Sequence, residues 1–169
     1  QAQLTESKQV LNPSDAPDQA AAVQRLRGEI DRQDAHTKIL DVATARFQSE
    51  EVALTSATDL LTRLKELSIQ AANDTLGPAD RKSVAVEMKS LRQQLLDLSN
   101  SKDDSGNFLF SGTRVKSQAF VEQADGSVQY MGDQSQTRIP AGVERTVAYT
   151  RSGTDVFSPP QRTQANGST

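Results

Sequence analysis

Cysteine and tryptophan are both absent from the 169 residues, and aromatic residues make up only 4% of the chain. The absence of cysteine excludes disulfides, thiolate nucleophiles and cysteine-ligated metals. With a hydrophobic content of 35%, the scarcity of aromatics argues against a single compact globule with a large core. No apolar run approaches the ~20 residues that a membrane-spanning helix needs, so we expect no membrane span. The net charge of −3 and the scattered lysines and arginines argue against nucleic-acid binding.

The first half of the chain contains a long segment without helix breakers. Residues 29–76 include neither glycine nor proline and are rich in strong helix formers. The segment Asp15-Ala16-Pro17-Asp18 is typical of a helix start, because Asp15 can accept from free N–H groups and proline is tolerated in the first turn. We therefore predict one helix from Asp15 to Thr75, about 90 Å long at ~1.5 Å per residue.

Apolar residues recur along this predicted helix with a seven-residue period, which is typical of an a/d stripe. A helix of this length has more apolar face than its own short partner can cover. We expect the part from Leu26 to Leu54 to meet another chain or a C-terminal helix, and in part the later strands. One row comprises Leu26, Gln33, Leu40, Phe47, Leu54, Leu61 and Ser68, a second comprises Ala43, Glu50, Ala57, Leu64 and Ala71, and Ile39, Ala53, Leu60 and Leu67 broaden them.

A second, shorter helix follows a turn. Gly77 suits a left-handed cap for the first helix, and Pro78 can open the next one. The short connection predicts that residues 79–100 return antiparallel to the end of the first helix. Apolar residues spaced by four, three, four and three residues form a heptad seam on it: Val84, Met88, Leu91, Leu95 and Leu98.

After residue 100 the pattern favours short strands. The turn at 124–126 predicts a β-hairpin, and β-branched and aromatic residues favour further strands beyond it. The expected fold class is α+β: an elongated rod with one very long helix and a shorter antiparallel helix, plus a small, mostly antiparallel β unit of four or five strands. The predicted strands are 107–110, 119–123, 127–131, 137–139 and 143–150. The expected divisions are an extended arm (1–14), a helical hairpin (15–105), a small β domain (106–157) and a flexible tail (158–169).

The sequence offers no convergent catalytic, cofactor-binding or metal-binding residues. The single histidine, His36, lies mid-helix beside basic residues that do not ligate metals, so we expect it to be solvated or to line a seam. Glu50 and Glu51 point to different parts of a helix surface and form no acid pair. Asp103-Asp104 lacks the regular ligand spacing of a calcium loop. We therefore expect neither an enzyme nor a cofactor.

Several segments resemble the flagellin superfamily. Residues 8–17, KQVLNPSDAP, are similar to the start of its first long helix. Residues 59–73, DLLTRLKELSIQAAN, resemble the end of that helix before a helix–turn–helix. Within the superfamily, residues 106–112, GNFLFSG, and the Tyr130-Met131-Gly132-Asp133 segment are closer to the members that join hook to filament than to flagellin. The resemblance covers residues 8–157.

This resemblance implies a structural adaptor of the bacterial flagellum. Such members are exported unfolded through the flagellar type III apparatus and form a ring that joins hook to filament outside the cell. The implied partners are hook-associated protein 1, flagellin, neighbouring copies of the chain and an export chaperone. The terminal helices that drive polymerisation in this family have no counterpart here, so we expect this stretch of chain to be a monomer in isolation.

Assembly and helix packing are expected to depend on the apolar stripe and on two neighbouring charges. Arg63 and Glu66 flank the stripe and could contact another subunit, although a simple exposed helix pair is the alternative. Two other functions remain open: a flagellin filament subunit, and a non-flagellar coiled-coil scaffold with a β binding tip. The candidate residues are Leu26, Leu40, Phe47, Leu54, Leu61, Leu64, Arg63, Glu66, Val84, Met88, Leu91, Leu95 and Leu98.

Overall fold

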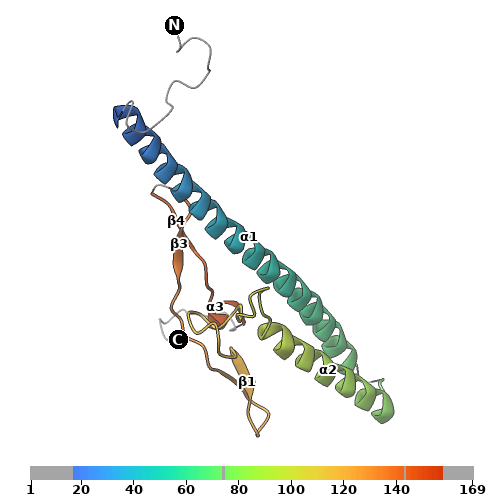
Figure 1. Cartoon of the computed structure of the whole chain (residues 1–169). Helices are drawn as coiled ribbons and strands as arrows, with labels where there is room; N and C mark the ends of the chain where they lie inside the picture. The colour runs from blue at the N-terminus through green and yellow to red at the C-terminus, as the bar shows by residue number, and fades with distance from the viewer. Residues whose placement is uncertain (1–16, 74, 143, 158–169) are drawn as a thin grey trace, which may run out of the picture. The chain divides into compact units, whose positions relative to one another are not determined.

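A computed structural model describes residues 17–73, 75–142 and 144–157, so the predicted arm at 1–14 and the tail at 158–169 lie outside the described residues. The α+β class is confirmed, with two principal helices and short antiparallel strand pairs (Figure 1). The chain divides into two compact units, residues 1–41 and 42–169. The elements are α1 (Pro17–Ala71), α2 (Pro78–Ser99), β1 (Phe120–Glu122), β2 (Val128–Tyr130), β3 (Arg138–Pro140), β4 (Thr146–Ala148) and α3 (Gly153–Phe157).

Helix α1 is a single helix of 55 residues, as predicted, but it ends at Ala71 rather than at Thr75. The Asn73 side chain explains the earlier end, because its Oδ1 accepts both the backbone N–H and the hydroxyl of Thr75. This local turn competes with further helical hydrogen bonds. None of the helices in the described ranges is long and apolar enough to cross a membrane.

The turn between the helices differs from the prediction at one residue. Gly77 is not a left-handed cap for α1: it is extended, at φ −68° and ψ 162°, and forms the N-cap of α2. Because Asn73 already turns the backbone, α1 needs no left-handed glycine. Pro78 opens α2 as predicted, where its missing N–H costs no helical bond.

Helix α2 returns antiparallel beside the C-terminal part of α1, and the two helices share an apolar core (Figure 1). Leu67 of α1 and Val84 and Leu91 of α2 are its buried residues. Arg63 of α1 also pairs with Glu87 of α2, at 2.8 Å between Nη2 and Oε1. The residues packed around this hairpin core are Leu60, Leu64, Ala71, Leu76 and Met88.

The strands form two separate two-stranded antiparallel sheets, β1–β2 and β3–β4. Phe120 pairs with Tyr130 across the predicted hairpin, whose turn places Gly126 at φ +81°. The predicted strand at 107–110 is wrong. Phe108 N–H donates to Val115 and Leu109 N–H to Ser101, so no continuous ladder forms. Leu109 and Phe110 are both fully buried instead of alternating between two faces.

A second apolar core joins helix α1 to the segment at residues 103–157, called the β region from here on. Its buried residues are Ala53 of α1 together with Leu109, Phe110 and Ala119. The prediction that part of the stripe up to Leu54 meets the later strands is confirmed for its last residue, since Leu54 packs on this core. The residues packed against the β core are Leu54, Phe120, Tyr130, Val156 and Phe157, the last two from α3, which the sequence did not predict.

Candidate functional site

The buried face of α1 in the second unit follows a heptad seam that differs from the first predicted row. Its side chains are buried or half-buried, and the spacing between them alternates between three and four residues, which keeps them on one face of the helix. The row through Phe47, Leu54 and Leu61 lies on the flank of this seam, and Leu61 is 52% exposed. The seam residues are Ala43, Arg46, Glu50, Ala53, Ala57, Leu60, Leu64, Leu67 and Ala71.

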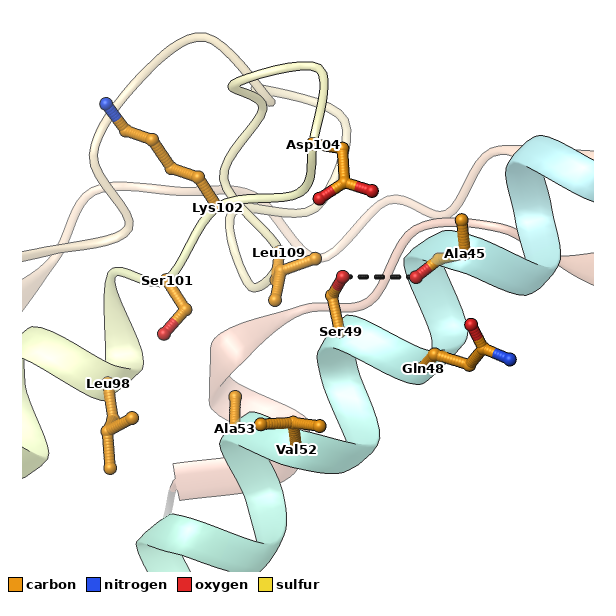
Figure 2. A pocket seen from close by; sticks show the side chains of 10 residues that line it. All are labelled: Ala45, Gln48, Ser49, Val52, Ala53, Leu98, Ser101, Lys102, Asp104 and Leu109. Carbon is orange, nitrogen blue, oxygen red and sulfur yellow. Dashed lines mark hydrogen bonds between the residues drawn. The ribbon is translucent and has the colours of Figure 1, made fainter.

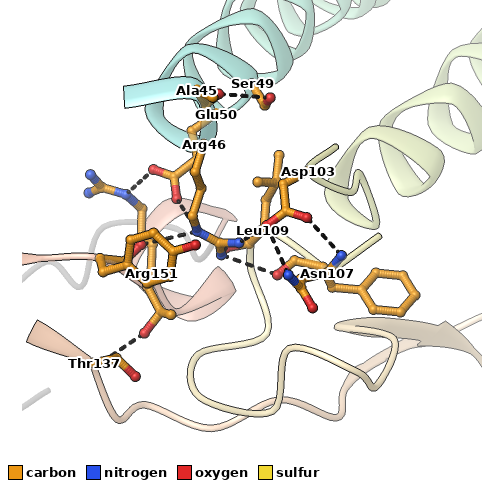
Figure 3. A network of polar contacts seen from close by, with 12 residues as sticks. Ala45, Arg46, Ser49, Glu50, Asp103, Asn107, Leu109, Thr137 and Arg151 are labelled. Carbon is orange, nitrogen blue, oxygen red and sulfur yellow. Dashed lines mark hydrogen bonds and ion pairs between the residues drawn. The ribbon is translucent and has the colours of Figure 1, made fainter. Parts of the chain in front are cut away.

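Arg46 is the largest fully buried side chain among the described residues, with an exposed fraction of 1%. Its guanidinium donates from Nη1 to Asp103 Oδ2 at 2.8 Å and from Nε to the Tyr149 carbonyl at 3.1 Å. Nη2 donates to the carbonyls of Phe108 at 3.2 Å and Leu109 at 3.0 Å. Figure 3 shows Arg46 of α1 beside Asp103 and Leu109. Its acceptors thus lie in three separate parts of the chain, at residue 103, at 108–109 and at 149.

The carboxylate of Asp103 is tightly held. It accepts from Arg46 and from both the backbone N–H and the side-chain amide of Asn107. Burial opposes its ionisation, but the hydrogen bonds from Asn107 and Arg46 outweigh burial and hold the pKa of Asp103 below its ordinary value of 3.8. Asp103 therefore stays ionised opposite the guanidinium and compensates its buried charge.

Glu50 is the less satisfied member of the cluster. Its Oε2 accepts from Arg151 Nε at 3.2 Å, whereas Oε1 lies 3.7 Å from Arg46 Nε. Among the described residues, no group donates a hydrogen bond to Oε1. Burial raises the pKa of Glu50 above its ordinary value of 4.5, and the hydrogen bond and charge of Arg151 and the charge of Arg46 offset this only in part.

The raised pKa of Glu50 predicts a pH dependence of stability. Between its folded-state pKa and 4.5, the native carboxyl binds more protons than the unfolded one, so this group stabilises the fold as the pH falls through that window. The contribution is lost as the pH rises through the folded-state pKa. We expect Glu50→Gln to remove this gain between neutrality and pH 4.5, measured as urea-unfolding free energy against pH. An unchanged profile in the variant would contradict the assignment.

The predicted pair Arg63 and Glu66 lies on the exposed surface of the helical hairpin. Arg63 Nη1 contacts Glu66 Oε2 at 3.1 Å, and Arg63 Nε donates to Glu87 Oε1 at 2.9 Å. The hydrogen bond that Arg63 donates to Glu87, and then the one that it donates to Glu66, raises the pKa of Arg63. These contacts within the chain correspond to the alternative of an exposed helix pair. Contact of Arg63 and Glu66 with another subunit stays a prediction.

Because surface ion pairs contribute little in water, Arg63→Ala is expected to shift Tm by no more than about 2 °C. Thermal unfolding followed by far-UV circular dichroism measures this. A fall as large as that expected below for Arg46 would mean that the surface pairs, and not the buried cluster, hold the helices together.

The other predicted residues are distributed over both cores and the surface. Leu64, Val84, Met88 and Leu91 lie in the hairpin core, and Leu54 lies on the β core. Leu40, Phe47, Leu95 and Leu98 are half-buried. Leu26, in the first unit, is 64% exposed.

A shallow hollow of about 390 Å³ lies between α1 and the turn after α2 (Figure 2). Its lining mixes small and apolar side chains of α1 with Lys102 and Asp104. The Ser49 hydroxyl donates to the Ala45 carbonyl at 3.1 Å, as an ordinary helical side chain does. No group of three or more metal-ligating side chains occurs in the described ranges, and His36 is half-buried on α1.

Among known protein families, the model of the bacterial flagellin N-terminal helical region matches residues 1–115 of the chain. The chain belongs to the bacterial flagellin family. The resemblance predicted from the helix ends is thereby confirmed, and it argues against the non-flagellar scaffold.

Relatives within this family extend the likeness beyond the helices. Flagellar hook-associated protein 3 of Escherichia coli is 28% identical over 155 residues, 92% of this chain and 48% of the relative. Polar flagellin A of Vibrio parahaemolyticus is 29% identical over 119 residues, 69% of this chain and 31% of the relative. The crystal structure of the flagellar junction protein FlgL from Legionella pneumophila is 31% identical, with a TM-score of 0.71, over 80% of this chain and 43% of that one.

The chain thus spans about half the length of the curated hook-associated relative that it matches. Arg46 was not among the residues predicted from the sequence, although Glu50 stood in the second predicted row of the stripe. A usable signal was present, because Arg46 and Glu50 occupy consecutive seam positions between Ala43 and Ala53. Charged residues in an otherwise apolar heptad indicate a buried ion pair or a change of packing partner.

Proposed function

We propose that this chain is the N-terminal portion of a structural adaptor that joins the flagellar hook to the filament. The observation that carries the proposal is the extent of the likeness. The match to hook-associated protein 3 covers 92% of the chain, whereas the match to polar flagellin A covers 69%. The family model of the helical region ends at residue 115, so the strands β1 to β4 lie beyond it.

The proposed partners are hook-associated protein 1 on one side and flagellin on the other, with neighbouring copies of the chain completing a ring. An export chaperone would bind the chain before secretion, and the mature location would be the hook–filament junction outside the cell. We further propose that the chain has no enzymatic role. In support, the buried guanidinium of Arg46 is bonded to Asp103 and to backbone carbonyls.

Contacts between subunits are proposed at the exposed members of the predicted stripe. Leu26 and Leu61 are 64% and 52% exposed, so each leaves apolar surface for a neighbouring molecule. Arg63 and Glu66 lie on the same exposed side of the hairpin as charges that a neighbour could pair. The helical hairpin and the β region remain the proposed structural divisions of the adaptor.

Genetic complementation tests the adaptor. In a strain that lacks its junction protein, flagellin monomers are released into the medium. We expect the full-length gene to restore filaments and to reduce extracellular flagellin to the wild-type level, as measured by electron microscopy and immunoblotting. Restoration of filaments only in a flagellin-null strain would instead identify the second candidate.

That second candidate is a flagellin filament subunit. One observation favours it: the matching family model carries the name of flagellin, and polar flagellin A of Vibrio parahaemolyticus matches 69% of the chain. The two candidates differ in copy number, because a filament subunit must accumulate in large excess over a junction ring. Quantitative immunoblotting of purified flagella separates them.

A further inference from the structure

The second unit contains two apolar cores that share helix α1 but lie at different positions along it. Leu67, Val84 and Leu91 form the hairpin core. Ala53, Leu109 and Phe110 belong to the β core, which α1 enters through a small side chain. Because local stability follows the apolar surface that each part buries, two such cores allow one part to open while the other stays folded.

The α1 seam changes character between these cores. In the hairpin the seam residues are leucines, Leu60, Leu64 and Leu67, which bury large apolar surfaces. Facing the β region, the seam residues from Ala43 to Ala53 are alanines and charged residues. Helix α1 contributes Ala53 and the flanking Leu54 to the β core, a smaller apolar area than its three seam leucines give the hairpin, so polar contacts carry more of its hold on the β region.

Those polar contacts pass through few side chains. Arg46 reaches Asp103, the carbonyls of Phe108 and Leu109, and that of Tyr149, so one guanidinium ties down the loop, the buried segment and the end of the β region. Glu50 adds a contact to Arg151. These two contacts join residues that are far apart in the sequence, by 103 positions for Arg46 and Tyr149 and by 101 for Glu50 and Arg151. Both start from neighbouring turns of one helix.

The β region is attached to α2 independently of this cluster. The Asn100 amide pairs with the backbone of Phe120 like a strand neighbour: Nδ2 donates to the Phe120 carbonyl at 2.8 Å, and Oδ1 accepts from its N–H at 2.9 Å. Arg92 Nη1 also contacts Glu122 Oε1 at 2.7 Å. These contacts from Asn100 and Arg92 do not involve α1.

We propose that Arg46 and Glu50 form a latch, and that the β region at residues 103–157 unfolds locally as one cooperative unit when this latch releases, while the α1–α2 hairpin stays folded. Four charged groups face one another in the latch: Arg46 and Glu50 from α1, Asp103 from the loop and Arg151 from the segment after β4. Two positive and two negative charges balance. Among the described residues no group donates a hydrogen bond to Glu50 Oε1, and this unsatisfied buried oxygen raises the free energy of the closed latch.

This local unfolding exposes the inner face of α1 and the buried side chains of Leu109 and Phe110. The latch is a property of this chain alone and does not depend on the proposed junction role.

Native-state hydrogen exchange of the wild-type chain, with residue resolution and low denaturant, tests the latch. The β-region amides of Leu109, Gly112 and Gly153 donate to backbone carbonyls and report on opening. We expect them to exchange with one common opening rate, about 10-fold or more faster than hairpin amides between Leu64 and Leu91. Identical exchange rates and denaturant slopes in both sets would overturn the proposal.

Arg46→Lys provides the second measurement, because lysine keeps the charge but cannot bond several acceptors in the fixed geometry of a guanidinium. We expect exchange in the β region to rise about 100-fold and hairpin exchange to stay unchanged. Arg63→Lys, an exposed arginine on the same helix, is the matched control and should alter neither set. Equal acceleration of hairpin and β-region amides by Arg46→Lys would overturn the latch.

The wild-type chain also gives a test should the variant fail to fold. Both tyrosines, Tyr130 and Tyr149, lie in the β region, whereas far-UV circular dichroism is dominated by the helices. We expect tyrosine emission to change at lower urea than the helical signal. Coincident transitions would contradict separate opening.

Discussion

Arg46→Ala is expected to lower the free energy of unfolding of the β region by about 3–5 kcal/mol, because it leaves buried acids without their compensating charge. Asp103 and the carbonyls of Phe108, Leu109 and Tyr149 would each lose a donor. At about 2–4 °C per kcal/mol for a chain of this length, Tm should fall by roughly 10 °C. Tyrosine emission during urea and thermal unfolding measures both quantities.

Two further variants identify the cause of this loss. Arg46→Met retains an apolar stem of similar length, so it separates lost hydrogen bonds from lost packing. Arg63→Ala removes an arginine from the exposed side of the same helix and should have little effect. Wild-type stability in Arg46→Ala would mean that the buried cluster does not hold the β region.

Gly112→Ala is expected to destabilise the β region by about 3–5 kcal/mol through backbone strain and overpacking together. Gly112 has φ +67°, a conformation that side chains rarely adopt. An added Cβ would collide with the backbone carbonyl of Asp133, lying 2.9 Å from its carbon. The Gly112 N–H donates to Arg151, so the segment cannot move aside without breaking a contact near the latch. Equilibrium urea unfolding followed by tyrosine emission measures the loss.

Gly126→Ala is the matched control. Gly126 has φ +81° in the β1–β2 turn, but nothing lies within 4 Å of an added Cβ. Only the conformational cost remains, and we expect a loss of about 1 kcal/mol. Equal losses at Gly112 and Gly126 would mean that the contact with Asp133 relaxes at no cost.

Much of the helical architecture could be predicted from local sequence. The segment without glycine or proline predicts α1, and Pro78 marks the start of α2. The α2 positions Val84 and Leu91 were correctly expected to be packed. These predictions succeed because helix propensity and heptad spacing act within a few residues of the chain.

The seam on α1 shows where local patterns are incomplete. The second predicted row lies in the buried seam, whereas the more apolar first row lies beside it: Leu61 of that row is half exposed, and Arg46, which belongs to neither row, is buried. From the sequence alone an arginine at this position is expected to be exposed. In the structure it is buried because Asp103 and the Tyr149 carbonyl accept its hydrogen bonds. Its burial depends on partners 57 and 103 residues away.

The sequence by itself determined the helices, their antiparallel connection, the β1–β2 hairpin and the likeness to the flagellin family, since each depends on short-range pattern or motif. The tertiary structure was needed to show that the second predicted row of α1 is more buried than the first, and that Arg46 joins it. It was also needed to show that Asn107–Phe110 is not a strand although Leu109 and Phe110 are buried, and that Arg46 and Glu50 contact the β region. These features follow from long-range compensation of charge and backbone polarity, since a buried ion is stable only where distant segments supply its partners.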